Sequence, residues 1–196
     1  MTETNLKIDR KEASHERILH AAAEAIRRHG VAGVSVADVM KRAGLTHGGF
    51  YAHFTSRDDM VAAAIHYAGK QSAESLEYTV EKLQRKGASP LRALIEAYLS
   101  PGHMHAPETG CVVAALGSDM ARQSEPMLDA SRERVLGLMR RVEAALPAAV
   151  KRAEAAVITS TLVGTLQLAR SLGGRQGLAL LETSRSALLD RYDTAG

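Results

Sequence analysis

The sequence contains a single cysteine, so no disulfide can form within the chain and no metal site can rest on paired thiolates. Long apolar runs are also missing. The longest stretch without a charged residue, 155–169, has 15 residues and includes five polar ones, whereas a membrane-spanning helix needs about 20 predominantly apolar residues. The polar first twelve residues lack the apolar segment of a signal peptide. We therefore expect a cytoplasmic protein that has no membrane partner.

Motifs of catalysis and cofactor binding are absent too. The sequence has no Gly-rich phosphate loop, no nucleophile elbow and no Cys/His pair at ligand spacing. His103 and His105 form an H-x-H pair, but Glu108 is the only carboxylate near them in the sequence. We therefore expect no enzyme, no metal and no cofactor.

Proline is scarce and strand patterns are missing, which predicts an all-α fold. There are five prolines, and no run of four residues alternates convincingly between apolar and polar. Apolar residues recur at three- and four-residue steps, with glycines or caps at the ends of the segments. The helices are expected at about 13–29, 36–43, 46–54, 57–86, 90–99, 111–122, 125–146, 148–172 and 175–191, with a loop at 101–107.

The positive charge is concentrated in the N-terminal part. Residues 1–57 hold nine Lys/Arg against six Asp/Glu, and residues 58–196 hold sixteen of each. The whole net charge of +3 therefore lies in the first part, which favours a polyanionic partner there.

Residues 36–55 have the pattern of a helix-turn-helix. VADVMKRA predicts one helix, GL a tight turn and THGGFYAHF a second helix. Gly44 stands where a steep helix crossing needs a residue that tolerates positive φ, and Ser35 and Asp38 suit the start of the first helix. In such a unit the second helix enters the DNA major groove with its N-terminal residues against the bases.

The stretch from Ile18 to Ile65, ILHAAAEAIRRHGVAGVSVADVMKRAGLTHGGFYAHFTSRDDMVAAAI, resembles the DNA-binding domain of the TetR/AcrR family of transcriptional regulators. The motifs that match are V-x-x-V-x-x-x-A-G-L-T, F-Y-x-H-F and S-[KR]-x-x-[LM]. Beyond about residue 70 only the helical layout is similar. Ser35 stands where the family often has Thr, and Arg57 where Lys is common.

The helix-turn-helix geometry and the resemblance assign roles in DNA binding. We expect base reading by Thr46, His47, Gly48 and Gly49. The resemblance implies phosphate contacts by Tyr51, His53 and Arg57, although His53 alternatively covers the third helix and Arg57 is alternatively a solvated surface charge. Phe50 and Phe54 are expected in the core of the small domain.

The resemblance also implies an all-helical C-terminal part that dimerises and encloses an effector pocket. Small residues along one helix and a leucine stripe on the next predict the dimer interface. Soft or amphipathic side chains of the central helices predict the pocket, with ordinary core packing as the alternative. The interface residues are Ala156, Ser160, Gly164, Leu181 and Leu188, and the pocket residues are Tyr67, Tyr98, His103, Met104, Met120, Met127 and Met139.

Cys111 allows two interpretations, a thiol sensor or a small packing residue. It follows Gly110 at an expected helix start, but its neighbours 112–115 are apolar and the nearest following cation is Arg122. We expect a packing residue.

The sequence thus predicts three parts: a flexible polar arm at 1–12, a helix-turn-helix DNA-binding domain at 13–72, and an effector-binding and dimerisation domain at 73–196, joined through a long fourth helix. The expected function is a homodimeric repressor, released from a palindromic double-stranded operator by a small-molecule effector. An activator is possible in the same fold. The alternative is a helical small-molecule-binding or enzymatic protein whose helix-turn-helix is vestigial.

Overall fold

The computed structural model describes the backbone of residues 3–193 and the side chains of residues 10–193. In this part of the chain every regular element is a helix, which confirms the all-α prediction. In order the elements are α1 (Glu3–His29), α2 (Val36–Arg42), the 3₁₀ helix η1 (His47–Ala52), α3 (Arg57–Gln84), α4 (Pro90–Tyr98), α5 (Pro101–His105), α6 (Val112–Leu116), the 3₁₀ helix η2 (Met120–Arg122), α7 (Glu125–Ala145), α8 (Glu154–Leu172) and α9 (Gly174–Tyr192).

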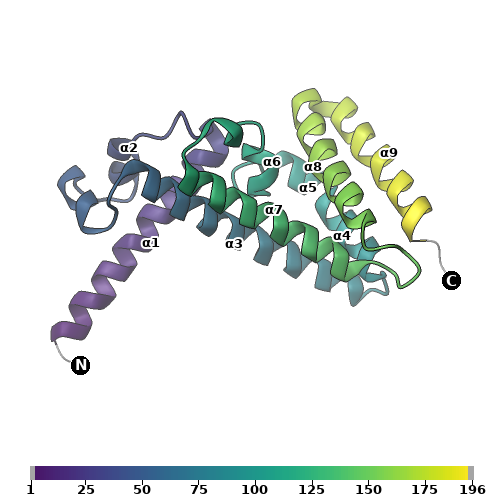
Figure 1. The fold of residues 1–196 in the computed structure, drawn as a ribbon, viewed down its shortest axis with the longest axis horizontal. Coiled ribbons are helices and arrows are strands. Elements are labelled where there is room, and N and C mark those ends of the chain that lie inside the picture. The colour runs from purple at the N-terminus through teal and green to yellow at the C-terminus, as the bar shows by residue number, and fades with distance from the viewer. Residues whose placement is uncertain (1–2, 194–196) are drawn as a thin grey trace.

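The long helices α3 and α7 run alongside each other through the length of the molecule (Figure 1). At one end α3 packs against α1, beside the short α2 and η1. At the other end α3 packs against α4, and α7 packs against α8, which pairs with α9. One continuous helix, α3, therefore connects the helix-turn-helix with the C-terminal part.

Four helices begin at a serine whose hydroxyl satisfies a free backbone amide. Ser35 Oγ accepts from Asp38 N at 3.4 Å and Ser56 Oγ from Asp59 N at 3.0 Å. Ser89 and Ser100 cap α4 and α5 in the same way. Such N-caps stabilise a helix by about 1 kcal/mol each. They fix where α2, α3, α4 and α5 start.

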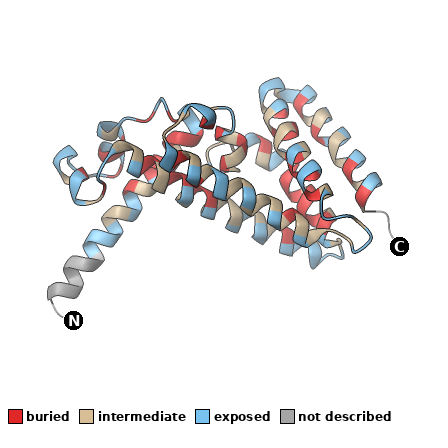
Figure 2. Ribbon diagram, in the orientation of Figure 1, coloured by how far each residue is buried: buried red, intermediate tan, exposed pale blue. Residues whose placement is uncertain are grey.

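Buried side chains form two clusters (Figure 2). The first includes Ile26, Phe50 and Ile65 of the N-terminal helices together with Leu116 and Met127 from α6 and α7. The second lies among α4, α8 and α9. The first cluster thus also includes side chains that follow residue 72 in the sequence, and position 72/73 lies within α3.

Three elements differ from the sequence-based expectations. Residues 3–12, expected as a flexible arm, form the first turns of α1, since they contain no glycine or proline to interrupt a helix; Met1 and Thr2 lie outside the described residues. The expected loop at 101–107 contains α5, because Ser100 caps a turn that Pro101 begins. The expected helix 111–122 is divided into α6 and η2 after Gly117, the C-cap of α6.

Candidate functional site

The helix-turn-helix has a tight turn at Gly44 and a first helix, α2, that Ser35 caps. Gly44 has φ of +69°, a conformation that side chains with a Cβ rarely adopt. The second helix of the unit is η1, a six-residue 3₁₀ helix, and Thr46 precedes it without a capping hydrogen bond from its side chain. The tight turn predicted from the sequence is thus present, and the helix that follows it is wound more tightly than expected.

The four residues expected to read bases lie at the start of η1. Thr46, His47 and Gly48 are exposed, and Gly49 is half-buried. An added Cβ on Gly48 would meet nothing within 4 Å, whereas one on Gly49 would lie 3.7 Å from Met40 Cε. The N-terminal end of η1 is therefore free to approach another molecule.

The aromatic residues of this unit divide between core and surface. Phe50 and Phe54 are buried, with ring centroids 5.8 Å apart, and His15 of α1 stacks on Phe54 at 4.7 Å. Tyr51, between them, is 73% exposed. The phenylalanines hold η1 against α1 and turn the Tyr51 hydroxyl outward, where a phosphate contact requires it.

His53 lies against α1, with its ring centroid 5.7 Å from that of His15. Its Nδ1 is buried and has no hydrogen-bond partner. Burial lowers the pKa of His53, and the neighbouring His15 and Lys11 lower it further. Its ring therefore covers the hydrophobic core of this unit and is less readily protonated than a free histidine.

Arg57, at the start of α3, is bound to the backbone of its own chain. Its Nε donates to Val34 O at 3.0 Å and its Nη2 donates to Val31 O. Its Nη1 lies 3.6 Å from Asp58 Oδ1. The guanidinium thus ties the α1–α2 connection to α3, a role that the sequence analysis missed because the two acceptors are backbone carbonyls far away in the sequence.

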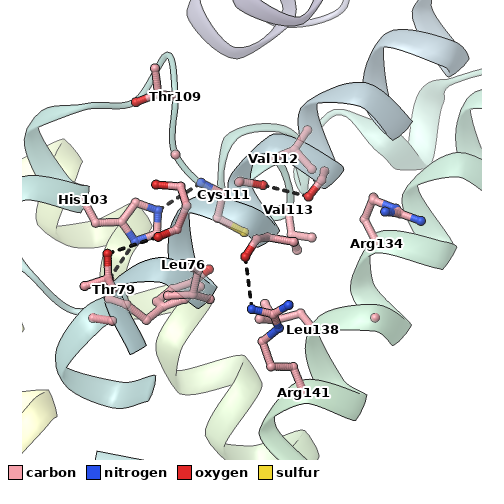
Figure 3. A pocket seen from close by; sticks show the side chains of 18 of the residues that line it. Leu76, Thr79, His103, Thr109, Cys111, Val112, Val113, Arg134, Leu138 and Arg141 are labelled. Carbon is pink, nitrogen blue, oxygen red and sulfur yellow. Dashed lines mark hydrogen bonds between the residues drawn. The ribbon is translucent and has the colours of Figure 1, made fainter. Parts of the chain in front are cut away.

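A cavity of about 500 Å³ lies in the C-terminal part (Figure 3). It is lined by residues from α3, the end of α4, the segment 100–113 and α7. Figure 3 shows Arg134 and Arg141 of α7 across the cavity from His103 and Thr79, with the Cys111 sulfur between the two sides.

His103 forms two hydrogen bonds at the wall of the cavity. Its Nδ1 lies 2.7 Å from Tyr98 O, and its Nε2 accepts the Cys111 backbone N–H at 2.9 Å. Since Nε2 accepts, the proton of the neutral ring lies on Nδ1 and is donated to the carbonyl. Burial lowers the pKa of His103 to about 4, so the ring is neutral at physiological pH.

The hydroxyl of Tyr98 is fully buried. Burial raises the pKa of Tyr98 well above its usual value, and the adjacent Cys111 thiol adds to this. Cys111 itself is partly exposed; it packs against the second hydrophobic cluster and also lines the cavity.

Two of the seven expected pocket residues, Tyr98 and His103, line this cavity. Met104, Met120 and Met127 are buried in the two hydrophobic clusters, and Tyr67 packs against the first of them. Met139 is half-buried on α7 but does not line the cavity. The sequence analysis missed the arginines of α7, because their spacing is typical of a solvent-exposed helix face.

The expected dimer residues fall into two groups. Leu181 and Leu188 are buried within the chain's own second cluster, because α9 turns its leucines toward α8. Ala156 and Ser160 are exposed and Gly164 is half-buried. On α8 the structure adds three large exposed apolar residues, Val157 (49%), Leu168 (59%) and Leu172 (53%).

No group of three or more potential metal ligands of the His, Cys, Asp and Glu types occurs among the described residues. Within the same part of the chain, every helix is too short or too polar to span a bilayer.

Known proteins resemble this chain both in the helix-turn-helix and in the overall fold. Residues 18–64 match the family described as bacterial regulatory proteins, tetR family. No curated protein sequence matches the chain. Among solved structures, reduced NemR of E. coli has a TM-score of 0.76 at 18% identity, covering 93% of this chain and 98% of that one. A TetR family regulator from Agrobacterium tumefaciens has a TM-score of 0.72 at 22% identity, covering 92% and 98%. A TetR regulator from Chloroflexus aurantiacus has 0.73 at 20%, covering 94% and 98%. At these identities the structural matches establish the fold.

Proposed function

Because the chain belongs to the TetR family of DNA-binding transcriptional regulators, we propose that it acts as a homodimeric repressor that a small-molecule effector releases from a palindromic operator. The observation that carries this proposal is that one helix, α3, connects the exposed helix-turn-helix to the cavity. Helix α3 begins beside η1 and lines the cavity from Gly69 to Thr79.

The exposed end of η1 supports DNA binding. Thr46, His47 and Gly48 are solvent-accessible at the helix start, where base-reading residues of a helix-turn-helix lie. The exposure of Tyr51 supports a hydrogen bond from its hydroxyl to a backbone phosphate. Arg57 donates to two backbone carbonyls and the His53 ring lies against His15, so we assign the first phosphate contact to Tyr51.

The apolar surface of α8 supports dimerisation. Val157, Leu168 and Leu172 lie on the exposed side of this helix together with the small residues Ala156 and Ser160. Large exposed apolar side chains on one helix mark an interaction surface, and small neighbours let a second helix approach closely. A second copy of the chain placed here would bring two η1 helices into a two-fold arrangement that matches a palindrome.

A buried arginine connects the DNA-binding end to the cavity. Arg27 of α1 donates from Nη2 to Ala68 O at 2.6 Å, and from Nη1 to Gln71 Oε1 and Glu108 O, each at 3.2 Å. Glu108 lies in the segment whose next residues, Thr109 to Cys111, line the cavity. A ligand that displaces this segment therefore alters a contact of α1, and differential binding to the two conformations lowers the affinity for DNA.

The experiment is a mobility-shift titration of the purified protein on the DNA upstream of its own gene, compared with random DNA of equal length at several salt concentrations. Specific binding at least 10³-fold tighter than binding to random DNA supports the proposal. Equal affinity for both DNAs supports the alternative, a small-molecule-binding or enzymatic protein with a vestigial helix-turn-helix.

A further inference from the structure

The cavity has a marked excess of positive charge. Its lining includes three arginines of α7, Arg134, Arg140 and Arg141, and one acid, Glu133. With His103 neutral, the lining carries two positive charges in excess, and one remains after the pairing of Arg141 with Glu77, an acid that does not line the cavity. Glu133 is mostly exposed and pairs with Arg134 at 3.1 Å and with His66 at 3.2 Å. The acid therefore neutralises only part of the charge on this wall.

The three arginines differ in how far partners within the chain already neutralise their charge. Arg141 pairs with Glu77 at 2.8 Å and donates to Ala73 O at 3.1 Å. Arg140 is exposed and forms no ion pair with the described residues. Arg134 lies across Gly69 of α3, so closely that an added Cβ there would be 2.1 Å from Arg134 Cδ. The absence of a side chain at Gly69 thus makes room for Arg134 between α3 and α7.

One buried donor of the cavity residues lacks an acceptor. The Nε of Arg134 is buried without a hydrogen-bond partner. An unpaired buried donor is unfavourable, and a charged one more so. The Tyr98 hydroxyl is buried as well, but the Cys111 thiol lies beside it. A ligand acceptor beside the Arg134 guanidinium is therefore favoured.

From the surplus charge and the unpaired Arg134 donor we infer that the effector is an organic anion, a carboxylic acid with an apolar body. Its carboxylate binds Arg134, and Arg140 of the same helix adds positive charge to this wall. This inference rests on the proposed function, since it names the chemical class of the effector for the same cavity.

The other residues that line the cavity suit the apolar part of such a ligand. Leu76 and Leu138 project from the two long helices, and Val112 and Val113 close the side of α6. A cavity of about 500 Å³ holds a small amphipathic molecule. Guanidinium groups bind carboxylates in a bidentate geometry, and a partly desolvated site strengthens that contact. A cationic effector would instead meet like charge from α7.

The test uses matched probe sets that differ only in the head group. Decanoate, decanamide and decylammonium form one set, and 4-phenylbutyrate, its amide and 4-phenylbutylammonium form another. Binding to the full-length protein is measured by calorimetry and by the shift in melting temperature. We expect the carboxylate of at least one set to bind about tenfold or more tightly than its amide, and the ammonium compound to bind weakest. An amide or ammonium compound that binds as tightly as its carboxylate in both sets overturns the inference, as does a panel in which no carboxylate binds.

Labelling of Cys111 tests whether the carboxylate binds in this cavity. Cys111 is the chain's only cysteine and lines the cavity, so protection from alkylation by N-ethylmaleimide reports occupancy of this cavity. A bound carboxylate should slow the labelling at least fivefold. Unchanged labelling at saturating carboxylate would place the ligand elsewhere and overturn the assignment.

Two variants and one control test the arginines. Arg134→Gln should weaken carboxylate binding about 10- to 100-fold and leave amide binding unchanged, and Arg140→Gln should do so to a smaller extent. Arg132→Gln removes the same charge from α7 outside the cavity, where Arg132 pairs with Glu125 and Asp129, and should change carboxylate affinity less than twofold. Equal losses in all three variants would indicate a long-range charge effect and refute the specific contact. Because Arg140 is exposed, its variant remains informative even if Arg134→Gln fails to fold.

Operator binding in the same samples separates the two proposals. Protein that binds its operator specifically but fails the head-group test retains the proposed function and refutes the carboxylate effector. Protein that selects carboxylates but does not distinguish operator from random DNA refutes the proposed function and keeps the ligand class.

Discussion

Arg57→Ala should destabilise the helix-turn-helix and not merely remove a DNA contact. In the folded protein the guanidinium donates to Val31 O and to Val34 O, both in the connection between α1 and α2. Alanine at this position leaves both carbonyls without that donor and frees the connection from the start of α3. The change therefore acts on the unit that positions η1.

The size of the effect follows from the two hydrogen bonds. A bond from a charged donor contributes about 1.5–3 kcal/mol in a buried setting. The Arg57 side chain is 36% exposed, so water replaces part of each bond, and the lower part of that range applies. The two bonds together give a loss of about 2–3 kcal/mol in the free energy of unfolding. For a chain of this size that corresponds to a fall in Tm of about 5–10 °C.

The measurements are urea or thermal unfolding followed by far-ultraviolet circular dichroism, and operator affinity across a salt series. Arg57→Lys should recover less than half of the lost stability, because an ammonium cannot reach both carbonyls as the planar guanidinium does. Tyr51→Phe is the matched control: operator affinity should fall with Tm unchanged, since Tyr51 is exposed. If Arg57→Ala left Tm unchanged while reducing the salt slope by about one unit, Arg57 would be a phosphate contact, as the family resemblance implied, and the reasoning here would be wrong.

Three further changes test other parts of the structure. Leu168→Glu, on the exposed apolar side of α8, should convert a dimer to a monomer in light scattering without lowering the helix content; a dimer that persists would place the interface elsewhere. The free energy of unfolding of the wild type should fall by about 3 kcal/mol between pH 6.5 and pH 4. Burial lowers the pKa of His103 to about 4 in the folded state, whereas the same ring in the unfolded chain takes up its proton near pH 6.5, so acid favours the unfolded chain. His103→Gln should flatten that dependence in urea titrations, whereas His105→Gln, on the exposed side of the same helix, should not. Arg27→Met removes the buried hydrogen bonds to α3 and to Glu108 O, and should reduce unfolding free energy by about 2–4 kcal/mol; a loss below 0.5 kcal/mol would show that burial of the charge cancels its bonds.

The parts of the fold that the sequence predicted well are those set by local chemistry. Ser35 and Ser56 cap helices as their positions indicated, and Gly44 takes the positive φ that the tight turn requires. Phe50 and Phe54 are both buried, as their spacing of four residues indicated, although only Phe50 lies within η1 and Phe54 follows it. Each of these features depends on neighbours within about four residues, so the amino-acid order determines it.

The cavity depends on contacts that the sequence does not record. The methionines looked suitable for a pocket, yet Met104, Met120 and Met127 fill the cores, because an apolar pattern does not distinguish a packed interior from a lined cavity. Conversely, the arginines of α7 follow a helical pattern typical of a solvated face. Only the approach of α3, with Gly69 opposite Arg134, turns that face toward a cavity.

In the proposed function, ligand and DNA act on the same elements of the structure. The first hydrophobic cluster joins α1 and η1 to α6 and α7, so the DNA-binding end has no core that is independent of the helices around the cavity. Arg134 fills the space beside Gly69, and Arg27 holds Ala68 O one residue earlier on α3. An anion that draws Arg134 toward itself therefore changes the packing of α3 next to the point where α1 is attached. Because packed interiors respond to such changes by moving whole helices, we expect a carboxylate effector to change the position of η1 relative to α3, as the proposed release from DNA requires.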